Sequence, residues 1–438
     1  MLLVIAFGFG TLGKPSSVWP LPGLAIRDRA ENKGDNVRTK AHRAAVLPTV
    51  VAMGLLASAC GNGAGSSSPS TSQPVTTPQL SATSFTRNFS AMAALKPLAA
   101  KGKGLVAAIL PDTVSSARYT EFDAPYLAKA FQTAGLSKSQ YVVQNAQGSP
   151  STELTYAQSD IARGASVLIM DPLNSGVGAQ IESYAKSHGV AVIDYDRLTL
   201  GGSRNYYVSF NNVAVGRLIG QGLVSCVSAW HVAKPNVLVM RGAPTDNNAT
   251  LFAQGYDSVI NPYFSSGKWT KAGAPAGTWD PPTAETEFQQ AYTAHKNMNA
   301  VLMPNDETAA PVITYLKTLH TPPRTFPVTG QDATLVGLQN ILSGYQCGTV
   351  YKPIYLEAQA AAALSLYLRA GQKPPASLVN GTTMDTTSHT SVPSVLLKPE
   401  WVTTSNMAAT VVKDNFVPAS QLCAGSYASA CKAAGISG

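Results

Sequence analysis

The sequence contains few of the residues from which metal centres and many catalytic sites are built. Among its 438 residues are five cysteines and six histidines. No two cysteines have C-x-x-C spacing and no two histidines are four residues apart, so the sequence gives no support for a zinc site. It also has no nucleophile elbow and no histidine-centred triad. We therefore expect neither a metal nor a cofactor.

Charged residues are also sparse. Lys, Arg, Asp and Glu make up 13% of the chain, and the formal net charge is +8. Residues 1–59 hold seven basic and three acidic residues, which leaves +4 for the remainder. Nucleic-acid binding calls for basic residues clustered on one face, whereas here they are dispersed. We expect no nucleic-acid partner.

The apolar run near the start of the sequence is shorter than a typical membrane-spanning helix. The basic segment 38–43 precedes an apolar run, 44–56, that is short of the roughly 20 residues a spanning helix needs. Small residues and Cys60 follow directly, which resembles a bacterial lipoprotein signal, in which the cysteine is lipidated. The alternative is an uncleaved anchor. We expect 1–59 to be a signal region, and a translation start downstream of Met1 would explain its length.

Lipidation at Cys60 would tether the protein to the outer face of the bacterial cytoplasmic membrane. From residue 61 to about residue 83 the chain is mostly Gly, Ser, Thr, Pro and Gln, a composition too polar to pack. We expect 60–103 to be the lipidated cysteine and a flexible tether, with folded structure beginning near Gly104. At the other end, 417–438 is expected to be a tail with a small cysteine loop.

The four cysteines beyond Cys60 can be read in two ways. Export to an oxidising compartment favours disulfides, and the simplest pairing is then Cys226–Cys347 and Cys423–Cys431. The alternative is four free, buried thiols. The connectivity depends on whether the chain is exported.

Short apolar runs that end in polar residues recur along the chain. In 191–197 a strand-like run stops at Asp196 and Arg197, and such side chains line the ligand crevice at the carboxyl ends of parallel strands. Helix-length segments separate the runs, as in repeated βαβ units. Two such rounds in tandem predict two α/β lobes with a ligand cleft between them. The runs are 104–110, 141–145, 167–171, 190–196, 206–212, 237–242, 300–306 and 326–332. In the last four of them we expect the strands themselves at 206–210, 237–240, 300–303 and 326–329.

Six segments carry a resemblance to a known family: 195–197, 207–212, 242–252, 305–309, 330–333 and 349–353. Together they resemble the ribose-type periplasmic sugar-binding proteins, and most of all their xylose-binding members. The segments lie in the family's order between about 104 and 398. The resemblance implies a periplasmic binding protein type I fold, with two Rossmann-like lobes, parallel sheets and a three-segment hinge. The N-terminal lobe would hold 104–211 plus about 353–390, and the C-terminal lobe 212–352 plus about 391–416.

The resemblance also implies which residues contact the sugar. Carboxylate, amide and guanidinium groups can each bridge neighbouring hydroxyls through charge-assisted bonds, and an aromatic ring can cover the sugar's C–H face. Tyr119 stands where the family has an aromatic residue, and Trp279 is the candidate for stacking. The family's other contacts fall on Arg118, Asp196, Arg197, Asp246, Asn248, Asn305, Asp332 and Lys352.

Several of these residues have a plainer interpretation. Asn305 and Asp246 precede helical segments and could be N-caps. Asp196 and Arg197 could neutralise each other, Lys352 could be a solvated surface residue, and Tyr119 could pack at the start of a helix. The set as a whole, at the strand ends, favours ligand contact.

The function implied is that of an extracytoplasmic solute-binding lipoprotein. It would be a monomer that captures a monosaccharide, an aldopentose such as xylose, and delivers it to the permease of an ABC importer. One alternative is a sensing partner of a membrane receptor. Another is a carbohydrate-active enzyme that uses two carboxyl groups of Asp196, Asp246 and Asp332. We expect no enzyme, because each Asp lies among Asn, Arg or Lys, and no acid of raised pKa is indicated.

Overall fold

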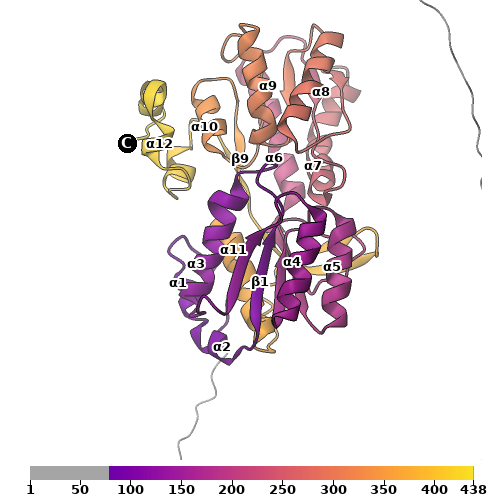
Figure 1. Cartoon of the computed structure of the whole chain (residues 1–438). Coiled ribbons are helices and arrows are strands. Elements are labelled where there is room, and N and C mark those ends of the chain that lie inside the picture. Colours follow the sequence, from indigo (N-terminus) through magenta and orange to yellow (C-terminus); the bar gives the residue numbers. More distant parts are fainter. Residues whose placement is uncertain (1–77, 438) are drawn as a thin grey trace, which may run out of the picture. The chain divides into compact units, whose positions relative to one another are not determined.

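The computed structural model describes residues 78–437 of the chain. The predicted signal region and the lipidation site, Cys60, lie outside the described residues. From residue 78 the chain builds two α/β lobes, each around its own sheet (Figure 1). In this described part, every helix is too short or too polar to cross a membrane.

The first lobe is organised around a seven-stranded sheet. Its strand order is β10-β11-β5-β4-β3-β1-β2, and all neighbours are parallel except β10, which runs antiparallel to β11. The strands are β1 (Leu105–Leu110), β2 (Tyr141–Asn145), β3 (Ala165–Met170), β4 (Ala191–Tyr195), β5 (Tyr206–Phe210), β10 (Gly381–Asp385) and β11 (Thr390–Leu397).

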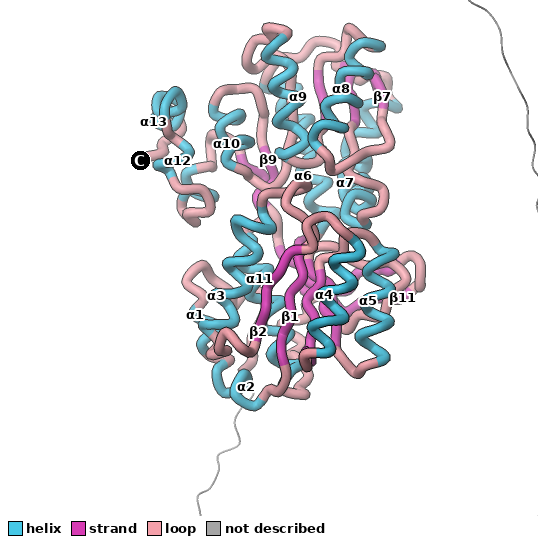
Figure 2. The backbone as a smooth tube through the Cα atoms, viewed as in Figure 1, coloured by secondary structure: helices cyan, strands magenta, loops and turns pink. Residues whose placement is uncertain are grey.

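Helices cover both faces of this sheet, because alternate residues of each strand point to opposite faces. Val106 and Ala108 of β1 pack in the same core as α3 and α11, whereas Ala107 and Ile109 pack with α4 and α5. Figure 2 shows these helices around the strands of the sheet. The helices are α3 (Ala124–Thr133), α4 (Pro150–Ala162), α5 (Ser175–Ser187) and α11 (Ile354–Arg369), with a π-helical turn, Tyr119–Asp123, leading into α3.

The second lobe has a smaller sheet. Strands β7, β6 and β8 are parallel in that spatial order, and β9 pairs antiparallel with β12. The predicted strand at 326–329 forms only an isolated bridge between Val301 and Val328. The strands are β6 (Asn236–Val239), β7 (Thr270–Gly273), β8 (Ala300–Leu302), β9 (Thr349–Tyr351) and β12 (Glu400–Val402), and the helices are α6 (Asn212–Ala229), α7 (Asn247–Ser265), α8 (Pro281–Ala294), α9 (Asp306–Thr318) and α10 (Leu335–Leu342).

Side-chain caps fix where the helices begin. In each capped helix the side-chain oxygen of the preceding residue accepts a backbone N–H of the first turn, which satisfies a donor that has no partner inside the helix. Because every one of these helices except α10 directly follows a strand, its cap stands near the carboxyl end of that strand. The capping residues are Ser149 (α4), Asn174 (α5), Asn211 (α6), Asp246 (α7), Asp280 (α8), Asn305 (α9) and Thr334 (α10).

Helices α6 and α7 of the second lobe approach each other closely along small residues. A Cβ atom on Gly216 would meet the backbone of Phe252, and one on Gly255 would meet the backbone of Val213. Only glycine lets the two helix backbones come this close. The close packing holds the start of α7, which carries Asp246 and Asn248, against the segment between β5 and α6, where the chain passes from the first lobe to the second.

The chain crosses between the lobes three times. The first crossing lies between β5 and α6 and the second between β9 and α11. The third was expected near residue 391, and this is wrong: β11 continues in the first lobe to Leu397, pairing in parallel with β5. The chain enters the second lobe only at β12, whose partner is β9. Hydrogen bonding to β5 therefore extends the first lobe beyond the predicted boundary.

The expected tether is folded over its described part. Residues 78–103 contain two short helices, α1 (Ser90–Ala93) and α2 (Lys96–Lys101), packed against α3 and α11 (Figure 1). Phe89 and Leu95 are buried, and Gln359 of α11 donates to the Thr86 carbonyl at 2.9 Å. Folded structure therefore begins well before Gly104, because scattered apolar residues in this segment find partners on the first lobe.

Both expected disulfides are present. Cys226 in α6 is bonded to Cys347, just before β9, and Cys423 is bonded to Cys431. The second bridge closes the tail, which contains α12 (Ala419–Leu422), a 3-10 turn (Gly425–Tyr427) and α13 (Ala428–Ala433). The tail contacts α10 through α12, and Leu422 is fully buried. The four cysteines are thus cross-links and not free thiols.

Candidate functional site

The residues predicted to contact a ligand all line one cavity between the two lobes. Ser115, Ser116, Phe252 and Gln331 complete the lining, and we call this cavity the cleft. The ten predicted residues that line it are Arg118, Tyr119, Asp196, Arg197, Asp246, Asn248, Trp279, Asn305, Asp332 and Lys352.

The fold explains why these distant residues meet. Each follows the carboxyl end of a strand or a strand-like segment, and these ends face the same gap. Asp196 and Arg197 follow β4, Lys352 follows β9, and Asn305 stands between β8 and α9. Two of the acidic residues have left-handed backbones, with φ of 57° at Asp196 and 91° at Asp332. Such strained residues tend to cluster at ligand sites, where the surrounding structure holds them in place.

Arg118 is held by three buried carboxylates. Its Nε and Nη2 donate to Asp123 at 2.9 and 2.8 Å, Nη1 donates to Asp196 at 2.9 Å, and Nη2 donates to Glu357 at 2.5 Å. A guanidinium has five N–H groups, so these four bonds leave one for a ligand. Arg118 therefore acts mainly by orienting Asp196.

Asp196 is ionised and ready to accept hydrogen bonds. Burial raises the pKa of its carboxyl, but the positive charges of Arg118, Lys352 and Arg197 outweigh burial and leave the pKa below its ordinary value. The Tyr119 hydroxyl donates to the second carboxylate oxygen at 3.0 Å. The plainer interpretation, in which Asp196 and Arg197 neutralise each other, does not describe this arrangement, because the carboxylate of Asp196 bonds to Arg118.

Arg197 connects the two lobes. Its Nη2 donates to the Ser115 and Tyr119 hydroxyl groups, both at 3.1 Å, within the first lobe. Its Nε lies 3.5 Å from Asp246 in the second lobe and 3.6 Å from Asp171 at the end of β3. Its Nη2 lies 3.9 Å from Asp112, so Arg197 brings a positive charge to a region that three acidic groups share.

Lys352 and Asp332 form a buried ion pair. The Lys352 Nζ lies 3.0 Å from Asp332 Oδ1, and the side chain of each residue is 4% exposed. Burial lowers the pKa of Lys352, but the negative charges of Asp332, Asp196 and Glu357 together outweigh burial and leave it raised. Lys352 is therefore a charged group inside the cleft, and not a solvated surface lysine.

The plainer interpretation holds in part for two residues, which serve as N-caps while also lining the cleft. Asp246 Oδ1 accepts the Asn248 N–H at 2.9 Å, and Oδ2 accepts Trp279 Nε1 at 3.0 Å. Asn305 Oδ1 accepts the Thr308 N–H at 3.1 Å, and its Nδ2 donates to the Ser115 carbonyl at 3.0 Å. A ligand would have to share these partners or replace them.

Two of the three aromatic side chains that line the cleft, Trp279 and Phe252, lie in the second lobe. The Trp279 ring packs over Gly242, where any Cβ atom would collide with it, and meets Phe252 edge-on with ring centroids 6.4 Å apart. The bond from its Nε1 to Asp246 fixes the plane of the indole. Trp279 is thereby positioned as an apolar wall beside polar groups.

Some charged residues of the site were missed by sequence reasoning. Asp123 and Glu357 hold Arg118, and Glu307 reaches from the second lobe to Ala117 N at 2.9 Å. A signal existed for Glu357: it is the one acidic residue in the apolar helix Ile354–Arg369, and a buried carboxylate needs a cationic partner. Nothing local marks Glu307, because its partner is 190 residues away.

Two acids in or beside the cleft have raised pKa values, which the sequence did not indicate. Burial raises the pKa of Asp246, although the nearby Arg197 opposes the shift. Burial also raises the pKa of Asp171 well above its ordinary value, and Asp196 adds to the effect. The sequence shows neighbouring Asn, Arg and Lys residues, but the degree of burial depends on how the two lobes meet.

Glu153, beside this site in α4, should make stability depend on pH. Burial raises the pKa of its carboxyl from 4.5 to about 8, against one hydrogen bond from the Leu173 N–H and the charge of Arg197. In the unfolded chain the Glu153 carboxyl loses its proton near pH 4.5, whereas in the folded protein it keeps the proton up to about pH 8. The free energy of unfolding should therefore fall as the pH rises from 5 to 8.

The variant Glu153→Gln keeps an acceptor for the Leu173 N–H and cannot ionise. Its unfolding free energy at pH 8 should exceed that of the wild type by on the order of 3 kcal/mol, with little gain at pH 4.5. Thermal unfolding at both pH values measures this. Parallel pH profiles for the two proteins would contradict it.

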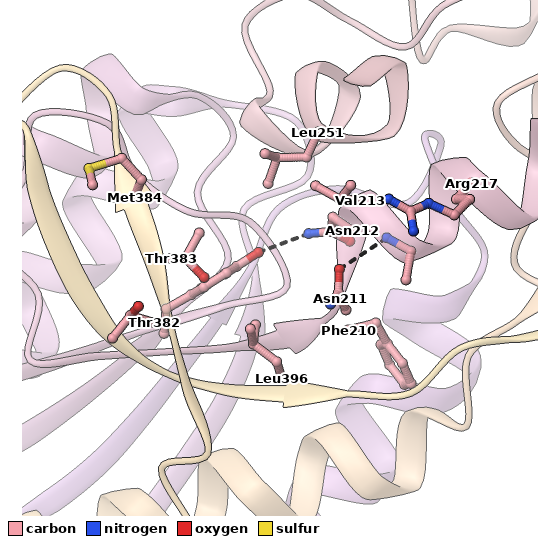
Figure 3. A pocket seen from close by; sticks show the side chains of 12 residues that line it. Phe210, Asn211, Asn212, Val213, Arg217, Leu251, Thr382, Thr383, Met384 and Leu396 are labelled. Carbon is pink, nitrogen blue, oxygen red and sulfur yellow. Dashed lines mark hydrogen bonds between the residues drawn. The ribbon is translucent and has the colours of Figure 1, made fainter. Parts of the chain in front are cut away.

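A second cavity adjoins the first crossing between the lobes (Figure 3). Asn212 donates to the Tyr207 hydroxyl at 3.0 Å and to Asn248 Oδ1 at 2.8 Å, and Asn211 Oδ1 accepts the Ala214 N–H at 3.0 Å. Asn248 in turn donates to the Asp196 carbonyl at 2.9 Å. The first crossing is therefore tied directly to the cleft.

The comparisons with known proteins agree with this architecture. Residues 107–373 match the family described as the periplasmic binding protein domain. The D-xylose-binding periplasmic protein of Escherichia coli (strain K12) is 37% identical over 285 residues, which cover 64% of this chain and 82% of that protein. The multiple sugar-binding periplasmic protein SbpA of Azospirillum brasilense is 31% identical over 340 residues, or 74% and 93% of the two chains.

A solved structure shares the fold. The carbohydrate transporter solute binding protein from Chloroflexus aurantiacus, in complex with D-glucose, superposes with a TM-score of 0.64 at 27% identity, covering 73% of this chain and 98% of that one. The resemblance to ribose-type sugar-binding proteins and the expected type I fold are both confirmed. From its sequence match and its two Rossmann-like lobes, this chain belongs to the periplasmic binding protein family.

Proposed function

We propose that this chain is an extracytoplasmic solute-binding protein that captures a monosaccharide, an aldopentose such as xylose, and delivers it to an ABC importer. The observation that supports this most strongly is the convergence of ten predicted residues from both lobes on one cleft. Capture would work by closing the lobes on the ligand, a shift in population that needs no chemical reaction.

The chemistry of the cleft suits a compact polyol. Three carboxylates and three cations line it, so that neighbouring hydroxyls can donate to one group and accept from another. Trp279 and Phe252 offer an apolar surface for the C–H face of a sugar ring. The names of the relatives, D-xylose-binding and multiple sugar-binding, support a monosaccharide and favour a pentose.

A ligand screen tests this proposal. A ligand that binds only the folded protein raises its stability by RT ln(1 + [L]/Kd), so thermal unfolding should report binding without a known affinity. We expect a pentose to raise the unfolding temperature and to give a one-to-one titration by calorimetry. No shift with any pentose or hexose would contradict the proposal, and steady release of product from a glycoside would favour an enzyme.

We propose further that the protein acts as a monomer, tethered to the outer face of the cytoplasmic membrane through lipid on Cys60, and that it docks on a permease. The support for the anchor is the basic segment, apolar run and small residues before Cys60. Cys60→Ser should move the protein from the membrane fraction to the soluble fraction. Equal membrane retention of the variant and the wild type would contradict lipidation.

A further inference from the structure

Glu307 makes contacts that its place in the chain does not explain. It lies in the first turn of α9, where an acidic residue is ordinarily favoured by the helix dipole alone. Its carboxyl nevertheless reaches into the first lobe. Oε1 accepts the Ala117 N–H at 2.9 Å and the Ser116 hydroxyl at 3.0 Å, and Oε2 accepts Asn305 Nδ2 at 3.0 Å.

The first-lobe segment that Glu307 contacts is held in shape independently. Asp112, directly after β1, accepts the N–H groups of Val114 and Ser115 at 2.8 and 2.7 Å and the Ser115 hydroxyl at 2.8 Å. This turn therefore presents the Ser116 hydroxyl and the Ala117 N–H as a ready pair of donors. Glu307 meets a preformed surface, which reduces the entropy lost when the bonds form.

Two other contacts join the same turn to the second lobe. Asn305 Nδ2 donates to the Ser115 carbonyl at 3.0 Å, and the Ser116 hydroxyl lies 3.1 Å from Asp332 Oδ2. Both Asn305 and Asp332 line the cleft, so Glu307 stands among residues that would meet the sugar. These bonds join protein groups directly and need no ligand as a bridge.

We propose that Glu307 is a positioning residue that latches the two lobes together and orients Asn305 for the sugar. Through Ala117 and Ser116 it stabilises the closed arrangement, and through Asn305 Nδ2 it fixes the amide at the cleft wall. The role in sugar retention rests on the proposed function. The latch itself does not, because its contacts are between protein groups.

The protonation of this cluster guides the choice of variants. A hydroxyl carries one hydrogen, so Ser116 cannot donate to Glu307 and Asp332 at once. Burial raises the pKa of Glu307 well above its ordinary value, with Asp332 and Asp306 adding to the shift. Lys352 balances Asp332 from the other side. Glutamine at position 307 removes the charge and keeps one oxygen that can accept the Ala117 N–H.

Small-angle scattering of the full folded protein, with and without xylose, tests the latch. We expect Glu307→Ala to have a larger radius of gyration than the wild type when no sugar is added. Glu307→Gln retains an acceptor for the Ala117 N–H and should stay closer to the wild type. Glu285→Ala is the matched control, because that glutamate lies on α8 of the same lobe and bonds to Gln289 within its own helix.

Stopped-flow measurement of sugar dissociation tests the positioning role. We expect dissociation from Glu307→Ala to be at least tenfold faster than from the wild type, with association changed much less, because the loss is of closed-state contacts. Faster dissociation is not expected for Glu285→Ala. Expansion without faster dissociation would overturn the role in sugar retention.

The latch and the sugar-binding proposal fail in different ways. If the wild type binds no monosaccharide, the proposed function fails, yet scattering of the sugar-free proteins still decides whether Glu307 holds the lobes. Unchanged dimensions of sugar-free Glu307→Ala, in a protein that remains folded by circular dichroism, would overturn the latch whatever the ligand is.

Discussion

Replacing Arg118 with methionine should lower the unfolding free energy by about 3–5 kcal/mol, the cost of leaving buried charges without their partner. Methionine fills much of the space but leaves Asp123, Asp196 and Glu357 facing one another. Even with Arg118 present, burial raises the pKa of Glu357 to about 8. Without the guanidinium these carboxyls should take up protons, so the loss of stability should be larger at pH 8 than at pH 5.

The control for this variant is Arg241→Met. Arg241 also pairs with a carboxylate, Asp257, at 2.9 Å, but the two side chains are 30% and 24% exposed. Solvent screens such a pair, which contributes about 0–1 kcal/mol, so this variant should unfold close to the wild type. Denaturant unfolding of both proteins at two pH values measures the difference. Equal stability of the Arg118 and Arg241 variants would show that the buried cluster is not held as described.

Asp332→Ala should weaken sugar binding by roughly 2 kcal/mol or more, about a thirtyfold rise in Kd. The change removes a charge-assisted acceptor from the cleft and leaves Lys352 buried without its partner. Alanine at this position should keep the strained backbone, whose φ is 91° at Asp332. The loss of affinity should therefore come from removal of the side chain. Calorimetric titration with the sugar found in the ligand screen measures the effect.

Asp280→Ala is the matched control for this change. Asp280 is an exposed N-cap of α8 that accepts the Thr283 N–H at 3.0 Å and lies outside the residues that line the cleft. Its loss should cost stability, as removal of a cap does, but should leave Kd unchanged. An Asp332 variant that binds the sugar as tightly as the Asp280 variant would remove Asp332 from the site.

Much of the fold was predictable because local patterns and tertiary packing agree. The apolar segments at β2 and β5 were expected with the bounds that the structure has, since each is a short strand-forming run between polar turns. The segment 78–103 was not, because α1 and α2 are very short and gain their stability from contacts with α3 and α11. The hairpin of β10 and β11 is rich in Thr and Ser, and the pairing of β11 with β5 keeps all of β11 in the first lobe, beyond the expected boundary at about residue 390.

In the candidate site, too, the features set by local sequence were predictable, and those set by contacts between distant segments were not. Asp196 and Arg197 could be placed in the cleft because strand ends in such folds face the ligand, and the family resemblance added the remaining positions, including Lys352. The sequence does not show which groups are already occupied by other residues. Asn305 is an N-cap that also bonds to Ser115 and Glu307. Three carboxylates occupy nearly all the donors of Arg118. Both arrangements depend on contacts between distant segments.

A crystal structure of the protein with bound xylose tests the central claim most directly. The account predicts one sugar in the cleft, with hydroxyl groups within hydrogen-bonding distance of Asp196 and Asp332 and a C–H face against Trp279. A sugar bound elsewhere, with these side chains making only the protein contacts described above, would contradict it.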